Sequence, residues 1–549
     1  MKIQLKILAA IIFFCFSHIA CGRVYESDEA VDDKQLTEHL ASSTTVYGYI
    51  RCRNKGLSNV IVSDGYQVAK TNAEGMYQLP SAKKLGYVFV SIPSGYTAPS
   101  IGVLPQIHKA VDKQQKLQKI DFELIDDGDQ SEYELIAIGD IQLARRSDDI
   151  SQFHHFTSEI NRYLDANKGK KVFGITLGDA TWDSHWLSGP YGFKDYLGDI
   201  NEIHGLQVFH TMGNHDHELE AEGDFYSSAK YRSMIGPTYY SFNIGKFHYV
   251  VLDDIECTND GTGTKATYNT YLVKEQINWL KRDLAAVPKN TPLIITMHAP
   301  LYRANGDTYL KNADDMLKCI QKFSKVYILS GHTHIIYNVD KLDQEPHVME
   351  LNSGSICGTW WYTGYDHPWL HIGKDGSPGG YRILNISGEN LTWYFKGIER
   401  PADYQFRSYD RNEIHIDIDK VAPSAKEKYR EQLAENLGEY GELNKENYIY
   451  VNVWDWDPSW KVEISENGKP LKVTRFKGTD PLHVMAYSVT RANMNKSLSF
   501  PSVNTRHLFK TKASAPDTTI EIKVTDRFGR IYKETMTRPK AFSIEACMK

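Results

Sequence analysis

The chain has 549 residues, more than one hydrophobic core normally organises, so we expect several domains. Its composition, with 41% hydrophobic and 24% charged residues, is that of a globular protein. The formal net charge of -6 and the scattered Lys and Arg residues exclude a nucleic-acid polymer as the expected partner, because proteins that bind one usually carry a basic stripe.

Residues 1–21 are typical of an export signal. Lys2 and Lys6 precede an apolar run, residues 7–16, that is too short to remain as a membrane anchor. The run leads into Ser-His-Ile-Ala-Cys, which ends at Cys21 and resembles a bacterial lipoprotein cleavage site. The resemblance implies a lipid anchor on Cys21 and a solvated tether over residues 22–43. The protein would then lie in the periplasm, in the outer membrane or at the cell surface; export without a lipid is the alternative.

The remaining cysteines predict isolated buried thiols. They show neither CxxC spacing nor a dense framework, and their odd number leaves at least one unpaired. A single disulfide is the alternative, and the sequence does not say which pair would form it. The five residues are Cys52, Cys257, Cys319, Cys357 and Cys547.

Residues 44–127 are predicted to form a small all-β domain. Residues 46–50 alternate as a strand does, and residues 59–63 run into Asp64-Gly65, a turn signal. Short strands with turns about every 8–12 residues are typical of a β-sandwich. The stretch resembles the prealbumin-like domains found beside secreted bacterial enzymes. We expect a spacer or packing role, with ligand binding as the alternative.

From residue 130 to about residue 400 the pattern changes to alternating strands and helices. Apolar runs predict strands at residues 133–138, 172–177, 206–212, 247–252, 293–297 and 326–329. Helical spacing of apolar residues predicts helices that carry Phe153, Phe156, Ile160 and Leu164, then Val273, Ile277, Leu280 and Leu284, then Met316, Ile320 and Phe323. The pattern indicates an α/β layered domain.

Residues 403–549 are predicted to form a β-rich C-terminal domain. Residues 448–453 and 519–525 read as strands, and Asn467-Gly468 is a hairpin signal. A charged helix is predicted over residues 424–437. Three tryptophans, Trp454, Trp456 and Trp460, are predicted to pack in a core, and an aromatic platform facing a sugar or substrate is the alternative.

Polar side chains follow five of the predicted strands in the central domain. In open α/β sheets ligands bind beyond the carboxyl ends of the strands, so we expect these groups to converge. A single Gly-Asp or His at such a place is weak support, but five in series are strong. The segments are Gly139-Asp140-Ile141-Gln142, Gly178-Asp179, Gly213-Asn214-His215-Asp216, His298-Ala299-Pro300 and Gly331-His332-Thr333-His334.

The mixture of residue types predicts a site for two metal ions. A carboxylate can bridge two cations, and oxygen ligands mixed with imidazoles suit Mn, Fe or Zn. Two such ions a few ångströms apart activate a water and stabilise the attacking and leaving oxygens of an in-line displacement. This is the chemistry of phosphoester hydrolysis.

These motifs resemble those of the calcineurin-like metallophosphoesterase family, over residues 130–400. The whole chain resembles a three-domain secreted bacterial subgroup, through stretches such as GPTYYSFNIGKFHYVVLDD and VNVWDWDPSWKVE. The resemblance implies an α/β (α+β layered) fold: a central double β-sandwich flanked by helices, between an all-β N-terminal sandwich and a β-rich C-terminal domain.

The resemblance also implies roles for single residues. Asp179 is the bridging carboxylate; Asp140, Gln142 and His334 bind one metal; and Asn214, His298 and His332 bind the other. His215, together with Asn214, contacts the phosphate, and His215 protonates the leaving oxygen. Asp216 orients His215, as carboxylates behind a site often do. Gln142 stands where many members have His, which weakens that ligand. Asp183 is expected behind the ligands, either in a hydrogen-bonding structural role or as a substrate contact, and His217 as a bystander or a rim contact.

The expected activity is hydrolysis of a phosphomonoester or phosphodiester by a metal-bridging hydroxide, with a small molecule or a lipid headgroup as the substrate. Trp360, Trp361 and Tyr381 follow the last ligand and are candidate substrate contacts, with packing between domains as the alternative. A different class of function is also open: a glycan- or partner-binding surface lipoprotein that uses the metal domain as a scaffold.

Overall fold

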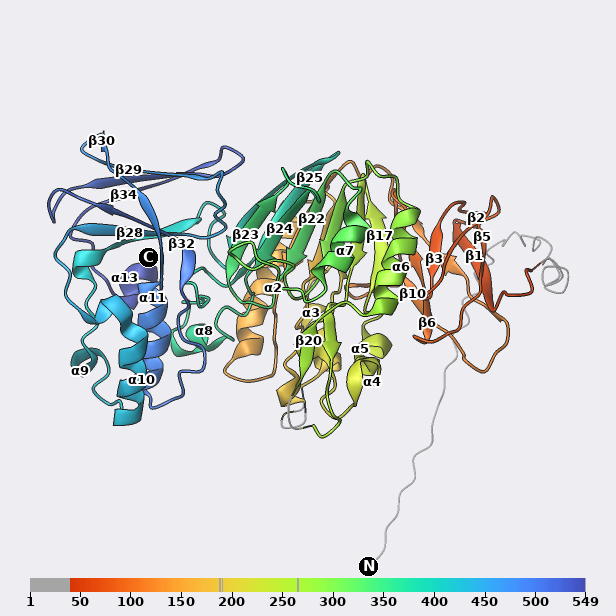
Figure 1. The fold of residues 1–549 in the computed structure, drawn as a ribbon, viewed down its shortest axis with the longest axis horizontal. Helices are drawn as coiled ribbons and strands as arrows, with labels where there is room; N and C mark the ends of the chain where they lie inside the picture. Colours follow the sequence, from red (N-terminus) through yellow and green to blue (C-terminus); the bar gives the residue numbers. More distant parts are fainter. Residues whose placement is uncertain (1–39, 187–188, 190, 264–265, 549) are drawn as a thin grey trace, which may run out of the picture. The chain divides into compact units, whose positions relative to one another are not determined.

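A computed structural model of the chain describes residues 40–186, 189, 191–263 and 266–548. The predicted export signal, including Cys21, lies outside these residues. The chain divides into two compact units, Met1–Ser42 and Ser43–Lys549, and the fold below is that of the second (Figure 1). Within the described ranges, no helix has both the length and the apolar character needed to cross a bilayer.

The N-terminal part consists of two small sheets that share a core, as predicted for a β-sandwich. One sheet holds β1 (Val46–Cys52), β2 (Lys55–Gly56), β5 (Met76–Leu79), β11 (Gln118–Lys119) and β12 (Phe122–Glu123). The other holds β3 (Ile61–Ser63), β4 (Val68–Lys70), β6 (Tyr87–Ser91) and β10 (His108–Ala110). Four shorter strands complete the connections: β7 (Tyr96–Thr97), β8 (Ser100–Ile101), β9 (Leu104–Pro105) and β13 (Ile125–Asp126).

The central part contains a five-stranded and a six-stranded sheet. The first has the order β16 (Gln207–Phe209), β15 (Val172–Thr176), β14 (Glu132–Ile138), β25 (Gly380–Ser387), β26 (Asn390–Gly397). The second has the order β17 (Tyr240–Ile244), β18 (Phe247–Val251), β21 (Leu293–Thr296), β22 (Val326–Ser330), β24 (Val348–Ser353), β23 (Ile336–Lys341). Strands β14, β15 and β16 are parallel, as are β18, β21, β22 and β24.

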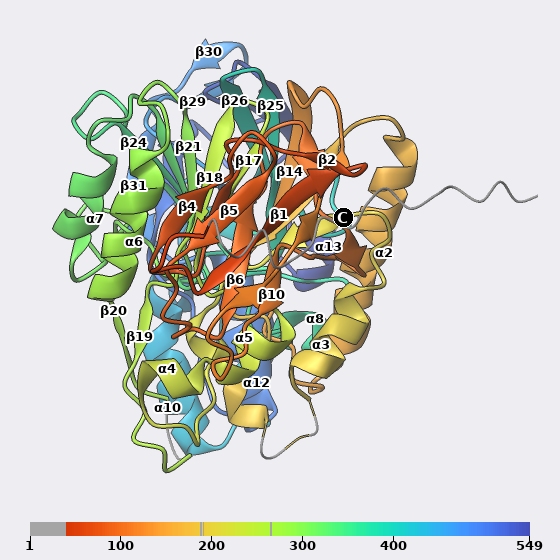
Figure 2. The same ribbon diagram turned by 90° about the vertical axis from the view of Figure 1, so that its right-hand side faces the viewer.

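The two central sheets face each other, with helices on their outer faces (Figure 2). Successive side chains of a strand point to opposite sides, and β14 shows the result. Leu135 and Ala137 join the core shared with the six-stranded sheet, whereas Ile136 packs against the helices beside the five-stranded sheet. The predicted double β-sandwich flanked by helices is therefore confirmed.

The predicted helical stripes are buried against the sheets. Helices α2 (Asp149–Ala166) and α3 (Phe193–Ile200) pack on the five-stranded sheet, and α6 (Lys274–Ala285) and α7 (Ala313–Ile320) pack on the six-stranded sheet. Two short helices, α4 (Gly223–Ser227) and α5 (Ala229–Met234), and the hairpin of β19 (Ile255–Cys257) with β20 (Tyr268–Thr270) lie in the connections. A further short helix, α8 (Tyr362–Asp366), follows β24.

The C-terminal part has two four-stranded sheets and a layer of helices. The sheets are β27 (Phe406–Asp410), β28 (Tyr448–Val453), β32 (Thr505–Lys512), β31 (Thr474–Gly478), and β30 (Lys469–Pro470), β29 (Lys461–Glu466), β33 (Ile520–Thr525), β34 (Ile531–Met536). The helices are α9 (Ile418–Val421), α10 (Glu427–Leu437), α11 (Pro481–His483), α12 (Thr490–Asn493) and α13 (Ile544–Met548), with a π-helix at Val484–Val489 between α11 and α12.

The tryptophans of the C-terminal part pack in cores, as predicted, although Trp454 packs against Ile336 and Phe395 of the central sheets. Trp454 is fully buried, and its indole N–H donates to the carbonyl oxygen of Tyr404. Trp460 is also buried, and Trp456 packs against Phe509. The alternative of an exposed aromatic platform is therefore wrong for Trp454 and Trp460. The five cysteines of the second unit are free thiols, as expected.

Candidate metal centre

The polar groups that follow the strands meet between the ends of the two central sheets. Asp140 follows β14, Asp179 follows β15 and Asn214 lies beyond β16, all in the five-stranded sheet. His298 and His332 follow β21 and β22 in the six-stranded sheet. Because parallel strands present their carboxyl ends at one edge, the sandwich brings these side chains together.

The backbone at these residues is in a conformation that non-glycine residues avoid. Asp140, Gln142, Asp179, His332 and His334 have φ angles of 46°, 48°, 55°, 66° and 53°. A side chain in this left-handed region costs free energy, and such residues gather at functional sites, where the surrounding fold holds them in place. The shared strain indicates that the loops after these strands are held in a costly conformation because it directs the side chains toward one another.

Two glycines permit the close approach of neighbouring strand ends. A Cβ atom on Gly213 would lie 2.3 Å from Asp179 Oδ1, and a Cβ on Gly331 would lie 2.4 Å from Asp140 Oδ2. Neither distance is possible for real atoms, so any larger residue would displace the carboxylate beside it. The glycines before the polar residues therefore keep the carboxylates in position.

The predicted ligands form two groups that meet at one carboxylate. In the first, Gln142 Nε2 lies 2.9 Å from Asp179 Oδ2, and His334 Nε2 lies 3.3 Å from Asp140 Oδ1. In the second, Asn214 Oδ1 lies 2.9 Å from His298 Nε2 and 2.8 Å from His332 Nδ1. His298 Nε2 lies 3.3 Å from Asp179 Oδ2, so this one oxygen contacts both groups.

The ligand atoms of this centre suit a cation. His298 Nδ1 donates to the carbonyl oxygen of Leu177 at 2.7 Å, which leaves Nε2 as an acceptor when the ring is neutral. That nitrogen, Asp179 Oδ2 and Asn214 Oδ1 then converge as three acceptors. Burial lowers the pKa of His298, but Asp179 outweighs burial and raises this pKa to about 10, so the place demands a positive charge.

The remaining atoms also fit divalent ions. Gln142 turns its Nε2 toward Asp179 Oδ2 and His334 Nε2, and its buried Oε1 has no hydrogen-bond partner among the described residues; an amide flip exchanges the two atoms and brings the oxygen to the place a cation would take. Candidate ligand atoms of Asp140, Asp179 and His298 all lie within 4.8 Å of one another. Carboxylate and amide oxygens mixed with imidazole nitrogens suit a first-row divalent metal.

His215 lies beside this centre and contacts a different carboxylate from the one predicted. Its Nδ1 lies 2.7 Å from Asp183 Oδ1, and its backbone N–H donates to Asp179 Oδ1. Asp216, which the resemblance assigns to this task, instead accepts backbone N–H groups of Ala180 and Gly213. The predicted role of Asp216 is therefore wrong: Asp183 orients His215, and Asp216 joins two strand-end loops.

The charge on His215 depends on the same neighbours. Burial lowers its pKa, but the carboxylates of Asp179 and Asp183 outweigh burial and raise the pKa above its usual value. The side chain of His215 is 23% exposed, so part of the ring is accessible to solvent. His217, in contrast, is buried with Nδ1 2.9 Å from Ser227 Oγ, away from the ligand set, as its lack of a predicted role implies.

Two of the three predicted substrate contacts lie in the core. Trp361 is completely buried, and its indole N–H donates to the carbonyl oxygen of Ile141. Tyr381 is buried on β25, and its hydroxyl donates to Glu159. Both side chains therefore pack within the central part, so neither substrate contact nor packing between domains is right for them. Trp360 does reach the centre, where its ring stacks on His334 at 4.0 Å.

A wall of aromatic and cationic groups continues from Trp360. The Phe500 ring, from the C-terminal part, stacks on Trp360 at 3.8 Å. Trp182 lies 5.8 Å from the His215 ring, and the Arg146 guanidinium lies 3.9 Å from the Trp182 ring. Both Phe500 and Trp182 are half-buried, which leaves part of each ring open. This wall did not emerge from the sequence, because Phe500 is far from every motif.

Two buried carboxylates support the loops and were also missed. Asp254 Oδ1 accepts the backbone N–H groups of His298 and Ala299, and Glu350 accepts those of Leu301 and Tyr302. Asp254 stands just beyond β18, so it is one more acidic residue at the end of an apolar run. The sequence therefore contained a signal for Asp254. Its role is to hold the backbone of His298, a candidate metal ligand.

The fold and this centre define a class: a double β-sandwich with a candidate metal centre at the ends of its parallel strands. Three family models match the chain in order: the N terminal of Calcineurin-like phosphoesterase over residues 44–127, Calcineurin-like phosphoesterase over residues 133–335, and the C terminal of Calcineurin-like phosphoesterase over residues 350–532. The chain belongs to the calcineurin-like phosphoesterase family. Metal-dependent hydrolysis of phosphoesters is the activity that this family membership supports.

Similar solved structures are distant. A purple acid phosphatase from yellow lupin (Lupinus luteus) seeds is 14% identical with a TM-score of 0.33; the match covers 49% of this chain and 52% of that one. GAP50, the anchor in the inner membrane complex of Plasmodium, is 14% identical with a TM-score of 0.31 over 49% of this chain and 85% of that one. A 5'-nucleotidase from Candida albicans is 12% identical with a TM-score of 0.31 over 64% and 74%. No curated protein matches the chain.

Proposed function

We propose that the protein hydrolyses a small-molecule or headgroup phosphoester, a monoester or a diester, with two divalent cations from the set Mn, Fe and Zn. The observation that carries the proposal is the position of Asp179, whose Oδ2 contacts both ligand groups. One carboxylate oxygen between two groups of candidate ligand side chains is what a pair of cations needs. Bound there, two cations would act as Lewis acids on the phosphoryl oxygens.

The chain's own residues supply the rest of the chemistry. Asp183 holds His215 by Nδ1, so Nε2 is free to hold a proton and pass it to the leaving oxygen. Asn214 directly precedes His215, and its Oδ1 lies among the second group of ligands. His215 and Asn214 together are suited to contact the phosphate as charge builds on its oxygens.

The aromatic and cationic wall beside the metal centre favours a substrate that carries a ring next to its phosphate. Trp182 and Phe500 keep exposed ring surface, which suits a flat or partly apolar leaving group. Arg146 and Lys374 add positive charge: Lys374 Nζ lies 5.0 Å from the Trp360 ring. Positive charge beside a phosphate site favours anionic substrates over neutral ones.

The test replaces the shared carboxylate. Asp179→Asn should lose metal from both groups and lower hydrolysis of p-nitrophenyl phosphate and bis-p-nitrophenyl phosphate by more than about 1,000-fold, because removal of one electrostatic contact alone costs 10²–10³. Metal content is measured in parallel, by atomic emission. Asp165→Asn, an exposed carboxylate near the end of α2, is the matched control and should change neither quantity. A wild-type protein that binds metal but cleaves no phosphoester of a broad panel would overturn the proposal.

Export with a lipid on Cys21 stays part of this proposal, supported by the sequence pattern alone. The anchor would place the metal centre near membrane headgroups as well as soluble phosphoesters. Cys21→Ser should move the protein from the membrane fraction to the soluble fraction, and mass spectrometry should find a lipid on Cys21 of the wild-type protein. An unmodified Cys21 in a mature protein would contradict the anchor.

A further inference from the structure

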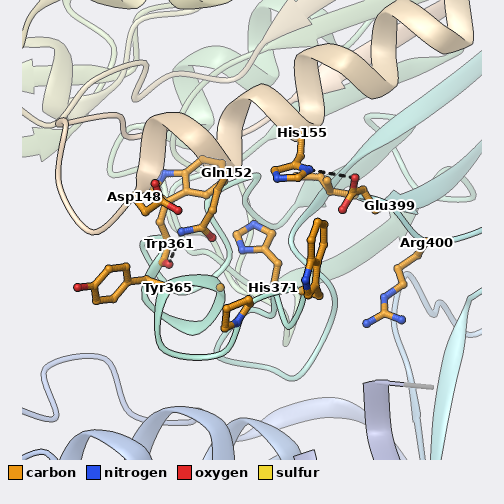
Figure 3. Close-up of a pocket in the computed structure, with 12 residues that line it drawn as sticks. Asp148, Gln152, His155, Trp361, Tyr365, His371, Glu399 and Arg400 are labelled. Carbon is orange, nitrogen blue, oxygen red and sulfur yellow. Dashed lines mark hydrogen bonds and ion pairs between the residues drawn. The ribbon is translucent and has the colours of Figure 1, made fainter. Parts of the chain in front are cut away.

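A pocket outside the metal centre lies between helix α2 and the segment that carries α8 (Figure 3). Its volume is about 330 Å³, within the range of small-ligand sites. None of the candidate metal ligands lines it. Gln152 and His155 enter from α2, Tyr365 and His371 from the α8 segment, and Glu399 from the chain after β26.

His371 presents a buried hydrogen-bond acceptor in this pocket. Its Nε2 lies 2.5 Å from the carbonyl oxygen of Ile356, so Nε2 carries the proton and Nδ1 is the acceptor. Nδ1 is buried and finds no partner in the part of the chain that the structure describes. Burial lowers the pKa of His371 to about 4, so the ring is neutral and keeps this acceptor at neutral pH.

Gln152 presents a second acceptor of the same kind. Its Nε2 donates to the carbonyl oxygens of Ser147 and Trp361, at 3.3 and 3.0 Å, and these bonds fix which end of the amide is oxygen. The Oε1 atom is buried, and among the residues described it has no partner. A buried acceptor without a donor costs free energy. Two of them at one pocket indicate a ligand that donates hydrogen bonds.

The rim of the pocket carries exposed aromatic rings. Trp369 is 64% exposed and Tyr365 is 49% exposed. Trp369 also has a φ of 74°, in the left-handed region that bulky residues avoid. Strain of this kind is commonly retained for a functional reason. The exposed indole offers a flat apolar face at the mouth of a pocket whose interior accepts hydrogen bonds.

The charges at the pocket are of both signs and favour a neutral ligand. Asp148 and Glu399 line it, which disfavours an anion, and Arg400 lines it too, which disfavours a cation. Glu399 Oε1 lies 3.1 Å from His155 Nδ1, so part of its charge is already engaged. A neutral ligand with several hydroxyl donors and one apolar face remains.

We propose that this pocket binds a saccharide. Hydroxyl groups of a pyranose ring would donate to His371 Nδ1, Gln152 Oε1 and the Glu399 carboxylate, and the apolar face of the ring would stack on Trp369. A hexose or a disaccharide suits a cavity of about 330 Å³. The site is separate from the metal centre and does not depend on phosphoester hydrolysis.

The test measures binding of methyl glucoside, methyl mannoside and methyl galactoside to the full chain, by saturation-transfer NMR and calorimetry. At least one glycoside should bind, and Trp369→Ala should weaken it about tenfold, because an aromatic contact of this kind is worth roughly one decade of affinity. Glu399→Gln should weaken it as well. Both side chains lie at or near the surface, so neither change should disturb folding.

A matched control and two further probes decide the outcome. Tyr226→Ala removes an aromatic ring that is 66% exposed on α4, far from this lining, and should leave binding unchanged. Hydrolysis of p-nitrophenyl phosphate should be the same in Trp369→Ala and wild type. No binding of any glycoside to the wild type, undiminished binding in Trp369→Ala, or choline or inorganic phosphate taking the pocket in place of the sugars would each overturn the proposal.

Discussion

Two carboxylates near His215 lie within the same buried cluster but contact different groups. Asp183 reaches the His215 ring, and Asp216 reaches the backbone of two loops. We therefore expect Asp183→Asn to lower kcat about 10- to 100-fold with little loss of stability, since a carboxylate behind a functional histidine sets its orientation. Asp216→Asn should instead lower the free energy of unfolding by roughly 1–3 kcal/mol, because buried N–H groups lose a charged acceptor.

Three measurements separate Asp183→Asn from Asp216→Asn: kcat with a chromogenic phosphoester, metal content and the urea midpoint of unfolding. If Asp183→Asn keeps full activity while Asp216→Asn is stable and inactive, the assignment of the two residues is reversed. The pH profile of kcat adds a second readout. It should shift in Asp183→Asn, because this carboxylate helps to raise the pKa of His215.

His210 provides a prediction about stability and pH. Burial lowers its pKa from 6.5 to about 4, although the nearby carbonyl oxygen of Val208 raises it slightly. Between pH 6.5 and about pH 4 the unfolded chain therefore binds a proton that the folded chain does not, so stability falls as the pH falls through this window. His210→Gln should remove this contribution, about 1.4 kcal/mol per pH unit.

The check on His210 is urea unfolding at several pH values between 4.5 and 6.5. The difference in unfolding free energy between the variant and the wild type should shrink as the pH falls, because only the wild type loses the contribution of this residue. Other titrating groups cancel in that difference. Parallel curves across the window would show that His210 does not resist protonation in the folded chain.

At the scale of elements, the strand ends rely on glycine as much as on the ligands. Gly331 precedes His332, and a Cβ there would meet Asp140 Oδ2 at 2.4 Å. Gly331→Ala should displace that carboxylate and lower both metal affinity and kcat by at least about tenfold, as a misplaced group in a metal site does. Metal titration followed by calorimetry gives the affinity, and steady-state rates give kcat.

Gly198→Ala is the control for this change. Gly198 lies in α3, where a Cβ would meet nothing within 4 Å, so the same substitution should leave metal binding intact. It should even stabilise the chain by about 0.5–1 kcal/mol, because alanine is the better helix former. Equal loss of metal in both variants would point to a general effect of added methyl groups and not to the strand end.

The sequence predicts the elements that carry their own signal. Buried parallel strands such as β14 and β22 are unbroken apolar runs, and the polar residue after each one marks the site. The hairpin of β25 and β26 was missed, although it completes the five-stranded sheet between Gly380 and Gly397. Its position depends on pairing with β14, more than two hundred residues earlier, and no local pattern encodes that contact.

The contrast between local signals and contacts of distant segments also explains which site residues were predicted correctly. Asp140, Asp179 and His298 were placed by strand ends, which are local. Which carboxylate orients His215 depends on how the loop after β15 folds back, and both Asp183 and Asp216 fit the local sequence equally well. Aromatic residues near a motif predicted substrate contacts, but the backbone turns at Trp360 and Trp361, with φ of 49° and 66°, send the two rings in different directions.

At the scale of the molecule, a loop of the C-terminal part contributes to the aromatic and cationic wall beside the metal centre. Phe500 stacks on Trp360, which in turn stacks on His334, so a residue between α12 and β32 helps to position a candidate metal ligand. His483 of α11 also contacts Thr359 at 2.8 Å, beside the same loop. The centre is therefore assembled by the central sheets and completed by the part of the chain that follows them.

Arg382 and Asp455 join the five-stranded central sheet to the C-terminal sheets. Arg382 on β25 is completely buried, and its Nη1 lies 2.8 Å from Asp455 Oδ1. Removing one partner leaves an uncompensated buried charge, so we expect Asp455→Ala to lower the free energy of unfolding by about 3–5 kcal/mol. Glu463→Ala, which breaks an exposed pair with Lys523, is the control and should change stability little. Urea unfolding measures both variants, and equal stability would show that this pair does not hold the two sets of sheets together.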